Sequence, residues 1–515
     1  MSMPLSRRTL LGLAAGGAAA VAISPEAADA APVEAFPHQD IEALEEKIRD
    51  GMSRYRIPGV AVGLWRRGRT YLRGFGVTDV DHPTPVTADT VFRVASTTKT
   101  FTGTTIMRLV EGHRMDLDRT VRGYLPDFRT ADPAASNRVT VRQVLNHSAG
   151  WLGDFFLDTG TGDDAIAKYV AAMSRLPQLT PPGSTFAYNN AALALAGRLI
   201  ETTTNRTYEQ AVRQLVLQPL GLRHTDYSLD DLPGVSWAVP HDIDPVSLEP
   251  VAQPGYWALP RSINAAGGLI SSARDQLRWA RFQLGNGRPL LTPRGLRYMQ
   301  SHPGPGGTLF VELDGAGVTW MIRPTAEGPQ VIQHGGDWAG QHSGFLMVPE
   351  RDFALTVLTN SEGGPGLTAE LFADDWALRR FAGVSNLPAV PRALPAAVLA
   401  GYEGTYTAEE ILPDGTAVTI AFDLVADAGQ LSLRIGGTEG LRLAFYRRDY
   451  VLALAPDGSD THVRCNFVRG AGGSVVWLRY GGRLYRRGGT ATTFGTSGGR
   501  LPAPATFPYA RGQGT

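Results

Sequence analysis

The stretch Ser96-Thr97-Thr98-Lys99 is the most informative part of this sequence for its fold and chemistry. It follows the apolar run Val91-Phe92-Arg93-Val94-Ala95 and opens a helical pattern that ends at Gly112. Residues three apart lie on one face of a helix, so the side chains of Ser96 and Lys99 are predicted to be adjacent. The positive end of the helix dipole favours negative charge that develops on a serine in the first turn.

A serine is a weak nucleophile until a neighbouring group accepts its proton. Lysine can accept that proton only if burial or nearby positive charge lowers its pKa, and lysine is rare here: Lys47, Lys99 and Lys168 stand among 49 basic residues. Taken alone, however, the S-x-x-K spacing arises by chance in many chains. For this motif alone, an N-cap serine beside a solvated lysine is the better interpretation.

Two further motifs change this interpretation. In Tyr188-Asn189-Asn190, residues two apart in extended backbone project to the same side, so Tyr188 and Asn190 can face one cleft. His334-Gly335-Gly336 stands at the end of a predicted strand, where glycines let a substrate backbone lie close to the strand edge. A tyrosinate beside a cation can take and return a proton.

In this order and spacing, S-x-x-K, Y-x-N and H-G-G resemble the serine β-lactamase and penicillin-binding-protein superfamily, in its branch of class C β-lactamase-like esterases and peptidases. The resemblance covers roughly residues 38–385. It includes Val91–Ala95, Thr140–Gly150 and Ala265–Leu269.

The resemblance implies roles for the motif residues. Ser96 would attack the acyl carbon, while Lys99 and Tyr188 would move its proton and later activate water. The residues that would hold the substrate and its oxyanion are Asn190, His334, Gly336 and Asp337. The oxyanion itself would accept hydrogen bonds from the backbone N–H groups of Ser96 and Asp337. No metal or organic cofactor is implied.

The third motif departs from the superfamily's usual Lys-Thr-Gly. His334 stands where that lysine would attract a carboxylate, and an imidazole is mostly neutral at pH 7. We therefore expect weak or no β-lactamase activity. The histidine form is common in the esterases and D-aminopeptidases of this branch.

The apolar patterns predict an α+β fold. Strands near both ends of the first region, with helices between them, indicate a β-lactamase-like domain: an antiparallel sheet flanked by helices, plus a helical subdomain. A helix is expected near 367–381. Eight short alternating strands then predict a small antiparallel barrel that resembles a lipocalin-like domain. The expected domain boundaries are 36–385 for the hydrolase domain, 386–395 for a Pro-rich linker, 396–487 for the barrel and 488–515 for a low-complexity tail.

The first 30 residues resemble a twin-arginine signal peptide, with Arg7-Arg8 before a short apolar run and Ala28-Asp29-Ala30 as the cleavage signal. We expect an exported bacterial protein without a stable membrane span. Lys+Arg and Asp+Glu balance at 49 each, so the chain has no net positive charge that would attract nucleic acid. The single cysteine, Cys465, excludes an intramolecular disulfide and reads as a buried structural thiol.

Three rival sites carry less weight. Gly495–Gly499 matches G-x-S-x-G but lies in the low-complexity tail. Ser148, in Asn146–Gly150, lacks the leading glycine of that motif, and the stretch is a structural turn in the superfamily. His147 beside it is interpreted as a satisfied core histidine and not as a base. The stretch His241–Asp244 offers few ligands for a metal and reads as a solvated loop.

The leading hypothesis is hydrolysis of amides or esters through an acyl-Ser96 intermediate, with D-residue peptides, including cell-wall fragments, as substrates. Acyl transfer or peptide cyclisation is the second hypothesis, and the export signal argues against it. A third, from another class, is an inactive protein that binds wall peptides. Oligomeric state is open.

Overall fold

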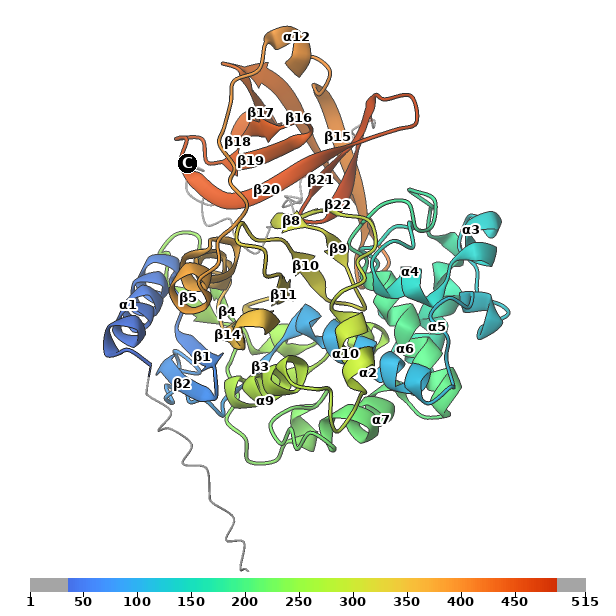
Figure 1. The fold of residues 1–515 in the computed structure, drawn as a ribbon, viewed down its shortest axis with the longest axis vertical. Coiled ribbons are helices and arrows are strands. Elements are labelled where there is room, and N and C mark those ends of the chain that lie inside the picture. Colours follow the sequence, from blue (N-terminus) through green and yellow to red (C-terminus); the bar gives the residue numbers. More distant parts are fainter. Residues whose placement is uncertain (1–35, 489–515) are drawn as a thin grey trace, which may run out of the picture. The chain divides into compact units, whose positions relative to one another are not determined.

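The computed structural model describes residues 36–488 (Figure 1). The expected signal peptide, all but the first residue of the expected tail, and the G-x-S-x-G match lie outside these residues. Within them, no helix is both long and apolar enough to cross a bilayer.

An antiparallel sheet forms the centre of the first domain and unites its two ends, as the strand pattern predicted. β1 pairs with β14 through Val60–Arg66 and Phe353–Thr359. Within residues 36–488 the sheet has eight strands, in the spatial order β2 (Arg69–Gly76), β1 (Gly59–Arg66), β14 (Phe353–Thr359), β13 (Gln341–Val348), β11 (Val331–Gln333), β10 (Met321–Arg323) and β9 (Gly315–Ala316), with β12 (Gly336–Trp338) paired to β13.

Both faces of the sheet are covered because side chains alternate along each strand. Val60 and Val62 of β1 pack on one face with Leu44 and Ile48 of α1 (His38–Tyr55). Ala61 faces the opposite core, which holds Leu277 of α9 (Ala273–Leu284). The sheet is therefore covered by an apolar core on each of its two faces.

The other helices of the first domain follow β2 in the sequence, and the last of them follows β14. They are α2 (Thr98–Glu111), α3 (Pro133–Arg138), α4 (Val141–Leu145), α5 (Ala165–Ala172), α6 (Asn190–Thr204), α7 (Tyr208–Val212), α8 (Asn264–Gly267), α9 (Ala273–Leu284), α10 (Pro293–Met299) and α11 (Gly364–Thr368). Three small strand pairs accompany them: β3 (Val91–Arg93) with β6 (Ile270–Ser272), β4 (His241–Ile243) with β5 (Pro250–Ala252), and β7 (Gly307–Leu309) with β8 (Val311–Leu313).

One expected helix is broken. The pattern predicted a helix near 367–381, but α11 ends at Thr368 and continues as two π-helical turns, Ala369–Ala373 and Leu378–Ala382. The buried Arg323 side chain binds the carbonyl oxygens of Phe372 and Ala373, which removes them from regular helical hydrogen bonding.

The second domain is the predicted closed barrel, preceded by α12 (Ala396–Leu399). In the described part of the chain its strands are β15 (Gly404–Ile411), β16 (Ala417–Asp427), β17 (Gln430–Ile435), β18 (Thr438–Arg447), β19 (Tyr450–Leu454), β20 (Asp460–Arg469), β21 (Val475–Tyr480) and β22 (Arg483–Arg487). Cys465 is buried in its core, as expected for a structural thiol.

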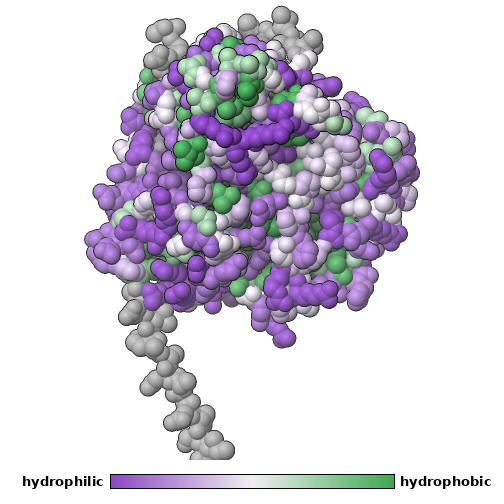
Figure 2. Space-filling model, turned by 45° about the horizontal axis from the view of Figure 1, so that its top comes forward, coloured by the Kyte–Doolittle hydropathy of each residue, from purple (hydrophilic) through white to green (hydrophobic). Residues whose placement is uncertain are grey.

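The barrel packs directly on the first domain. Ile411 forms a β-bridge with Phe155, and Arg464 forms one with Phe310. Glu312 of β8 accepts hydrogen bonds from Tyr446 and Arg464 and pairs with Arg447. The face of the molecule shown in Figure 2 is mainly hydrophilic, with apolar residues in small separate groups.

Candidate active site

Ser96 lies in a short 3₁₀ turn, Ala95–Thr97, that leads directly into α2. The sequence predicted Ser96 in the first turn of the helix, and the structure places it in the 3₁₀ turn immediately before α2. Ala95 has φ +43°, in the left-handed region that non-glycine residues rarely adopt. This sharp entry separates Ser96 from the regular helix and places it on the wall of the cavity.

Lys99 is fully buried and adjacent to the serine, as the spacing predicted. Its Nζ lies 2.8 Å from Ser96 Oγ and 2.7 Å from the carbonyl oxygen of Ala266. Burial, and then the positive charge of Arg483, hold the pKa of Lys99 well below its usual value. A neutral amine is therefore available to accept the serine proton.

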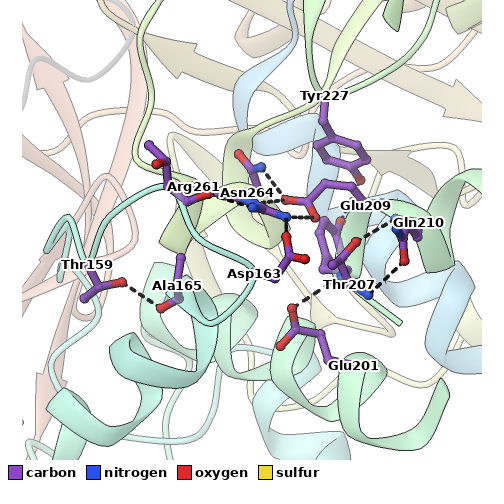
Figure 3. A network of polar contacts seen from close by, with 12 residues as sticks. Thr159, Asp163, Ala165, Glu201, Thr207, Glu209, Gln210, Tyr227, Arg261 and Asn264 are labelled. Atoms are coloured by element: carbon purple, nitrogen blue, oxygen red, sulfur yellow. Dashed lines mark hydrogen bonds and ion pairs between the residues drawn. The ribbon is translucent and has the colours of Figure 1, made fainter. Parts of the chain in front are cut away.

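A polar network holds the segment that supplies Ala266. Figure 3 shows that Arg261 and Asn264 both donate to the carboxylate of Glu209, Arg261 at 3.2 Å and Asn264 at 2.7 Å. Arg261 also pairs with Asp163 at 2.8 Å. These contacts of Arg261 and Asn264 hold the segment whose Ala266 carbonyl oxygen accepts from Lys99.

Tyr188 is brought to the serine from a distant loop. Its phenol hydrogen-bonds Ser96, and Lys99 Nζ lies 5.1 Å from the centre of its ring. Burial raises the pKa of Tyr188, which makes the neutral phenol the stable form rather than the tyrosinate that the sequence suggested. The free base is then the amine of Lys99, with Tyr188 as a proton carrier.

His147 lies behind Tyr188. Its ring stacks on the Tyr188 ring with centroids 4.6 Å apart, and its Nδ1 accepts the backbone N–H of Asn189 at 3.0 Å. Nε2 of His147 has no hydrogen-bond partner among residues 36–488. Burial lowers the pKa of His147, so it supports the tyrosine as a neutral ring and not as a base in contact with the serine.

Asn190 begins α6 and lines the same cavity as Tyr188, as predicted from the Y-x-N spacing. Asn189 caps the helix by accepting from the Ala192 N–H. Asn190 Nδ2 donates to Asp154 Oδ1 at 2.8 Å. The cap and this bond together set the direction of the Asn190 amide.

The third motif forms the opposite wall. A Cβ on Gly336 would overlap the Val94 carbonyl oxygen and lie 2.6 Å from the Ser96 nitrogen, so only glycine lets β12 approach the serine backbone this closely. Asp337 follows on β12 and lines the cavity, while its carboxylate contacts His342 Nδ1 at 2.9 Å. The family resemblance implied that the backbone N–H of Asp337 is one of the two oxyanion donors.

His334 is 3% exposed, and its Nε2 has no hydrogen-bond partner among the described residues. Burial and the nearby Lys99 lower the pKa of His334 to about 3. The imidazole is therefore neutral at physiological pH, in line with the weak attraction for carboxylates expected from its place in the motif.

Two residues of the site were missed by the sequence analysis. Arg483, from the barrel, lines the cavity, and its guanidinium carbon lies 4.8 Å from the centre of the Tyr188 ring. Asp154 pairs with it at 2.9 Å. The turn Gly481-Gly482-Arg483 carried a signal, since two glycines beside a charged residue allow a close approach, but the barrel's position was unknown.

The motif residues surround one cavity of about 220 Å³. Apart from Lys99, which lies behind the wall, they line it together with Arg483 and apolar side chains such as Phe156, Leu259, Met321 and Phe372. His241 does not line this cavity: it is buried in β4, and its Nδ1 bonds to the backbone carbonyl of Asn360. This corrects the solvated-loop prediction for that histidine.

Comparison with known proteins agrees with this geometry. The family description Beta-lactamase matches residues 44–378. The chain belongs to the β-lactamase family. Its membership covers the sheet, the helices and all three motifs, whereas the barrel lies beyond the match.

Relatives of this β-lactamase-family protein include one named a penicillin-binding protein and one named a hydrolase. It is 30% identical over 360 residues to penicillin-binding protein 4 of Amycolatopsis lactamdurans, which covers 67% of this chain and 93% of the relative. It is 26% identical over 461 residues to an unguisins hydrolase of Aspergillus violaceofuscus (strain CBS 115571), covering 77% and 78%.

A solved structure of SurE with D-Leu is similar over both domains. It covers 88% of this chain and 100% of that chain, with TM-score 0.67 and 27% identity. The eight-stranded barrel fits the expected lipocalin-like domain.

Proposed function

We propose that this protein is a serine hydrolase that cleaves amide or ester bonds through an acyl-Ser96 intermediate, as a D-stereospecific peptidase, carboxypeptidase or esterase. The observation that carries the proposal is the 2.8 Å contact between a fully buried lysine amine and the Ser96 hydroxyl. Nucleophile and base within hydrogen-bond reach are what covalent catalysis by serine requires.

The steps follow from the positions of these groups. Ser96 Oγ bonds to the acyl carbon while its proton passes to the neutral Lys99 amine. The proton returns through Tyr188 to the leaving amine or alcohol as the acyl–leaving-group bond breaks. Water then attacks the acyl carbon and gives a proton to the Lys99/Tyr188 pair. The acyl–Oγ bond breaks, Ser96 Oγ takes that proton back, and the acid is released. The backbone N–H groups of Ser96 and Asp337 stabilise the oxyanion, and one such donor contributes about 100- to 1,000-fold in rate.

Serine-directed labelling tests the nucleophile. A fluorescent phosphonate should label the wild type and fail to label Ser96→Ala. Ser148→Ala is the matched control, because Ser148 is buried and bonded to Asn146 Oδ1 at 2.6 Å. Unlabelled wild type, or equal labelling of Ser96→Ala, would favour the inactive wall-peptide binder instead.

The substrate is proposed to carry a free carboxylate beside a D-residue. Arg483 places a guanidinium on the cavity wall, and its bonds to Asp154 and Gly481 engage only three of its five N–H donors. It could replace the cation that His334 does not supply. The similar SurE structure with D-Leu supports a D-amino acid in such a site.

A substrate panel tests this preference. We expect D-residue peptides with a free carboxyl end to be cleaved better than their amides, and nitrocefin to be cleaved poorly. Arg483→Met should reduce the preference for the free carboxylate by about 10- to 100-fold, since a bond to a charged group is lost. Arg486→Met, an exposed position on the same strand, should leave the preference unchanged.

Hydrolysis is separated from acyl transfer in the same assays. Added amine acceptors such as D-Leu would yield a peptide product if the enzyme is an acyltransferase or cyclase, and free acid if it is a hydrolase. We also propose export by the twin-arginine route. Lys-Lys in place of Arg7-Arg8 should leave the protein in the cytoplasm of an expressing bacterium, and normal export of that variant would contradict the proposal.

A further inference from the structure

The barrel contacts the segment that carries the Y-x-N motif at three successive points. Arg479 Nε of β21 donates to the carbonyl oxygen of Phe186 at 2.9 Å. The backbone N–H of Tyr188 donates to the carbonyl oxygen of Gly482 at 2.9 Å. The third point is Asp154, whose carboxylate reaches both Asn190 and the barrel.

Gly482 fits against the tyrosine with no space to spare. It has φ +76°, and a Cβ there would lie 2.9 Å from the Cβ of Tyr188 and 2.9 Å from Leu309 Cδ1. Real Cβ atoms do not approach this closely, because repulsion rises steeply below van der Waals contact. The turn between β21 and β22 therefore determines how far Tyr188 stands from the barrel.

Asp154 joins the two domains through one carboxylate. Its Oδ1 accepts from Asn190 Nδ2 at 2.8 Å and from Arg483 Nη2 at 3.2 Å, while Oδ2 accepts from Arg483 Nε at 2.9 Å. The backbone beside it is bonded to the barrel as well, since the Ile411 N–H donates to the Asp154 carbonyl oxygen at 2.9 Å. The orientation of the Asn190 amide is thus tied to the barrel's position.

Part of the space between this segment and the barrel is empty. A second cavity of about 740 Å³ lies there, lined by Gly153 and Ala187 of the first domain and Trp477 and Leu484 of the barrel. Tyr188 and Arg483 line both cavities. On the barrel side, the polar contacts and the Gly482 turn hold the segment, while hydrogen bonds to His147 and Gly153 hold it from the first domain.

We propose that the barrel is a positioning element of the active site, and that Asp154 is the positioning residue through which it orients Asn190. This rests on the proposed function, because it concerns the same tyrosine and asparagine. Reacting groups must be held within a fraction of an ångström, and a misplacement of about 1 Å can cost about 100-fold in rate.

The test compares two interdomain ion pairs in the full-length protein. Asp154→Asn removes the negative charge from the contact with Arg483, and Asp154→Ala removes the contact itself. Glu312→Gln weakens a separate interdomain network in which Glu312 accepts hydrogen bonds from Tyr446, Arg447 and Arg464. Both lower the melting temperature, but only the Asp154 variants should lower kcat on a neutral ester, by about 10- to 100-fold. Asp154→Glu should recover part of the loss.

The pH profile adds a readout that a purely structural role would not move. The Asp154 carboxylate raises the pKa of Lys99, against the larger opposite effects of burial and Arg483. Removing its charge should therefore move the acid limb of kcat/KM to lower pH. Asp154→Ala with kcat within twofold of Glu312→Gln and an unmoved limb would overturn the positioning role.

A glycine pair tests the turn itself if the Asp154 variants do not fold. Gly482→Ala places a methyl group against Tyr188. Gly473→Ala imposes the same backbone cost at φ +78° in another barrel turn, where nothing lies within 4 Å. We expect phosphonate labelling of Ser96 to slow at least tenfold more in Gly482→Ala; equal rates would overturn the proposal. Loss of labelling in the wild type would instead overturn the proposed function.

Discussion

Among single residues, Lys99 does what no other cation could do at its position. It is buried beside the serine and its pKa is held well below the usual value, so it loses its proton far more easily than an exposed lysine. Arginine retains its proton in proteins. We predict that Lys99→Arg lowers kcat on an ester at least 1,000-fold, roughly the loss seen when a triad member is removed. Circular dichroism controls for folding, and near-normal turnover would remove the lysine from the mechanism.

His334 makes a second prediction at this scale. Its pKa is lowered to about 3, so it is neutral throughout the range in which the enzyme is expected to work. The pKa of Lys99 is lowered too, and its amine becomes free as the pH rises through that pKa. Activity on a neutral ester should therefore rise with pH on a limb that belongs to Lys99.

His334→Gln checks this assignment. Because the imidazole carries no charge in the working range, replacing it with a neutral amide should change the rate but leave the limb within about half a pH unit. A limb that disappears in His334→Gln would assign it to the histidine instead. Wild-type and variant pH–rate profiles on one uncharged ester provide the measurement.

At the scale of elements, strand β12 must lie against the 3₁₀ turn that carries Ser96. Gly336 allows this approach, since a Cβ would meet the Val94 carbonyl oxygen and the Ser96 nitrogen. Gly335, its neighbour, has more room, with a Cβ 3.1 Å from the Ser343 carbonyl oxygen. Gly336→Ala should therefore lower kcat by about 100-fold, as for loss of an oxyanion donor, and Gly335→Ala by much less.

The comparison isolates the oxyanion geometry. Both variants lie in the same motif and lose the same backbone freedom, so their melting temperatures report the general cost of a methyl group there. Binding of a boronic acid, which mimics the tetrahedral intermediate, should weaken in Gly336→Ala only. Equal effects of the two substitutions would show that β12 does not need this close approach.

For the whole molecule, the contacts between the domains predict joint unfolding. Glu312 is 6% exposed and Arg464 8%, so separating the domains leaves these charges without their partners at high cost. The β-bridge between Phe155 and Ile411 adds a backbone link. We expect calorimetry to show one transition that coincides with loss of phosphonate labelling. A barrel that melts first while labelling persists would contradict this expectation and weaken the positioning role.

Much of this architecture was predictable from local patterns. The strands near both ends of the first domain, the eight barrel strands and the helix that follows Ser96 were predicted from their apolar periodicities, because period and turn residues are local properties. The broken helix after Thr368 was not predictable, since distant Arg323 takes its carbonyl groups.

The sequence by itself determined the nucleophile candidate, its lysine and the family, because those depend on residue types at short spacing and on the order of three motifs. Only the tertiary structure decided that Tyr188 is a neutral phenol, that His334 is uncharged, and that Arg483 and Asp154 belong to the site. Burial sets the first two, and burial is a property of the folded molecule. The last depends on how a second domain packs, which no local pattern encodes.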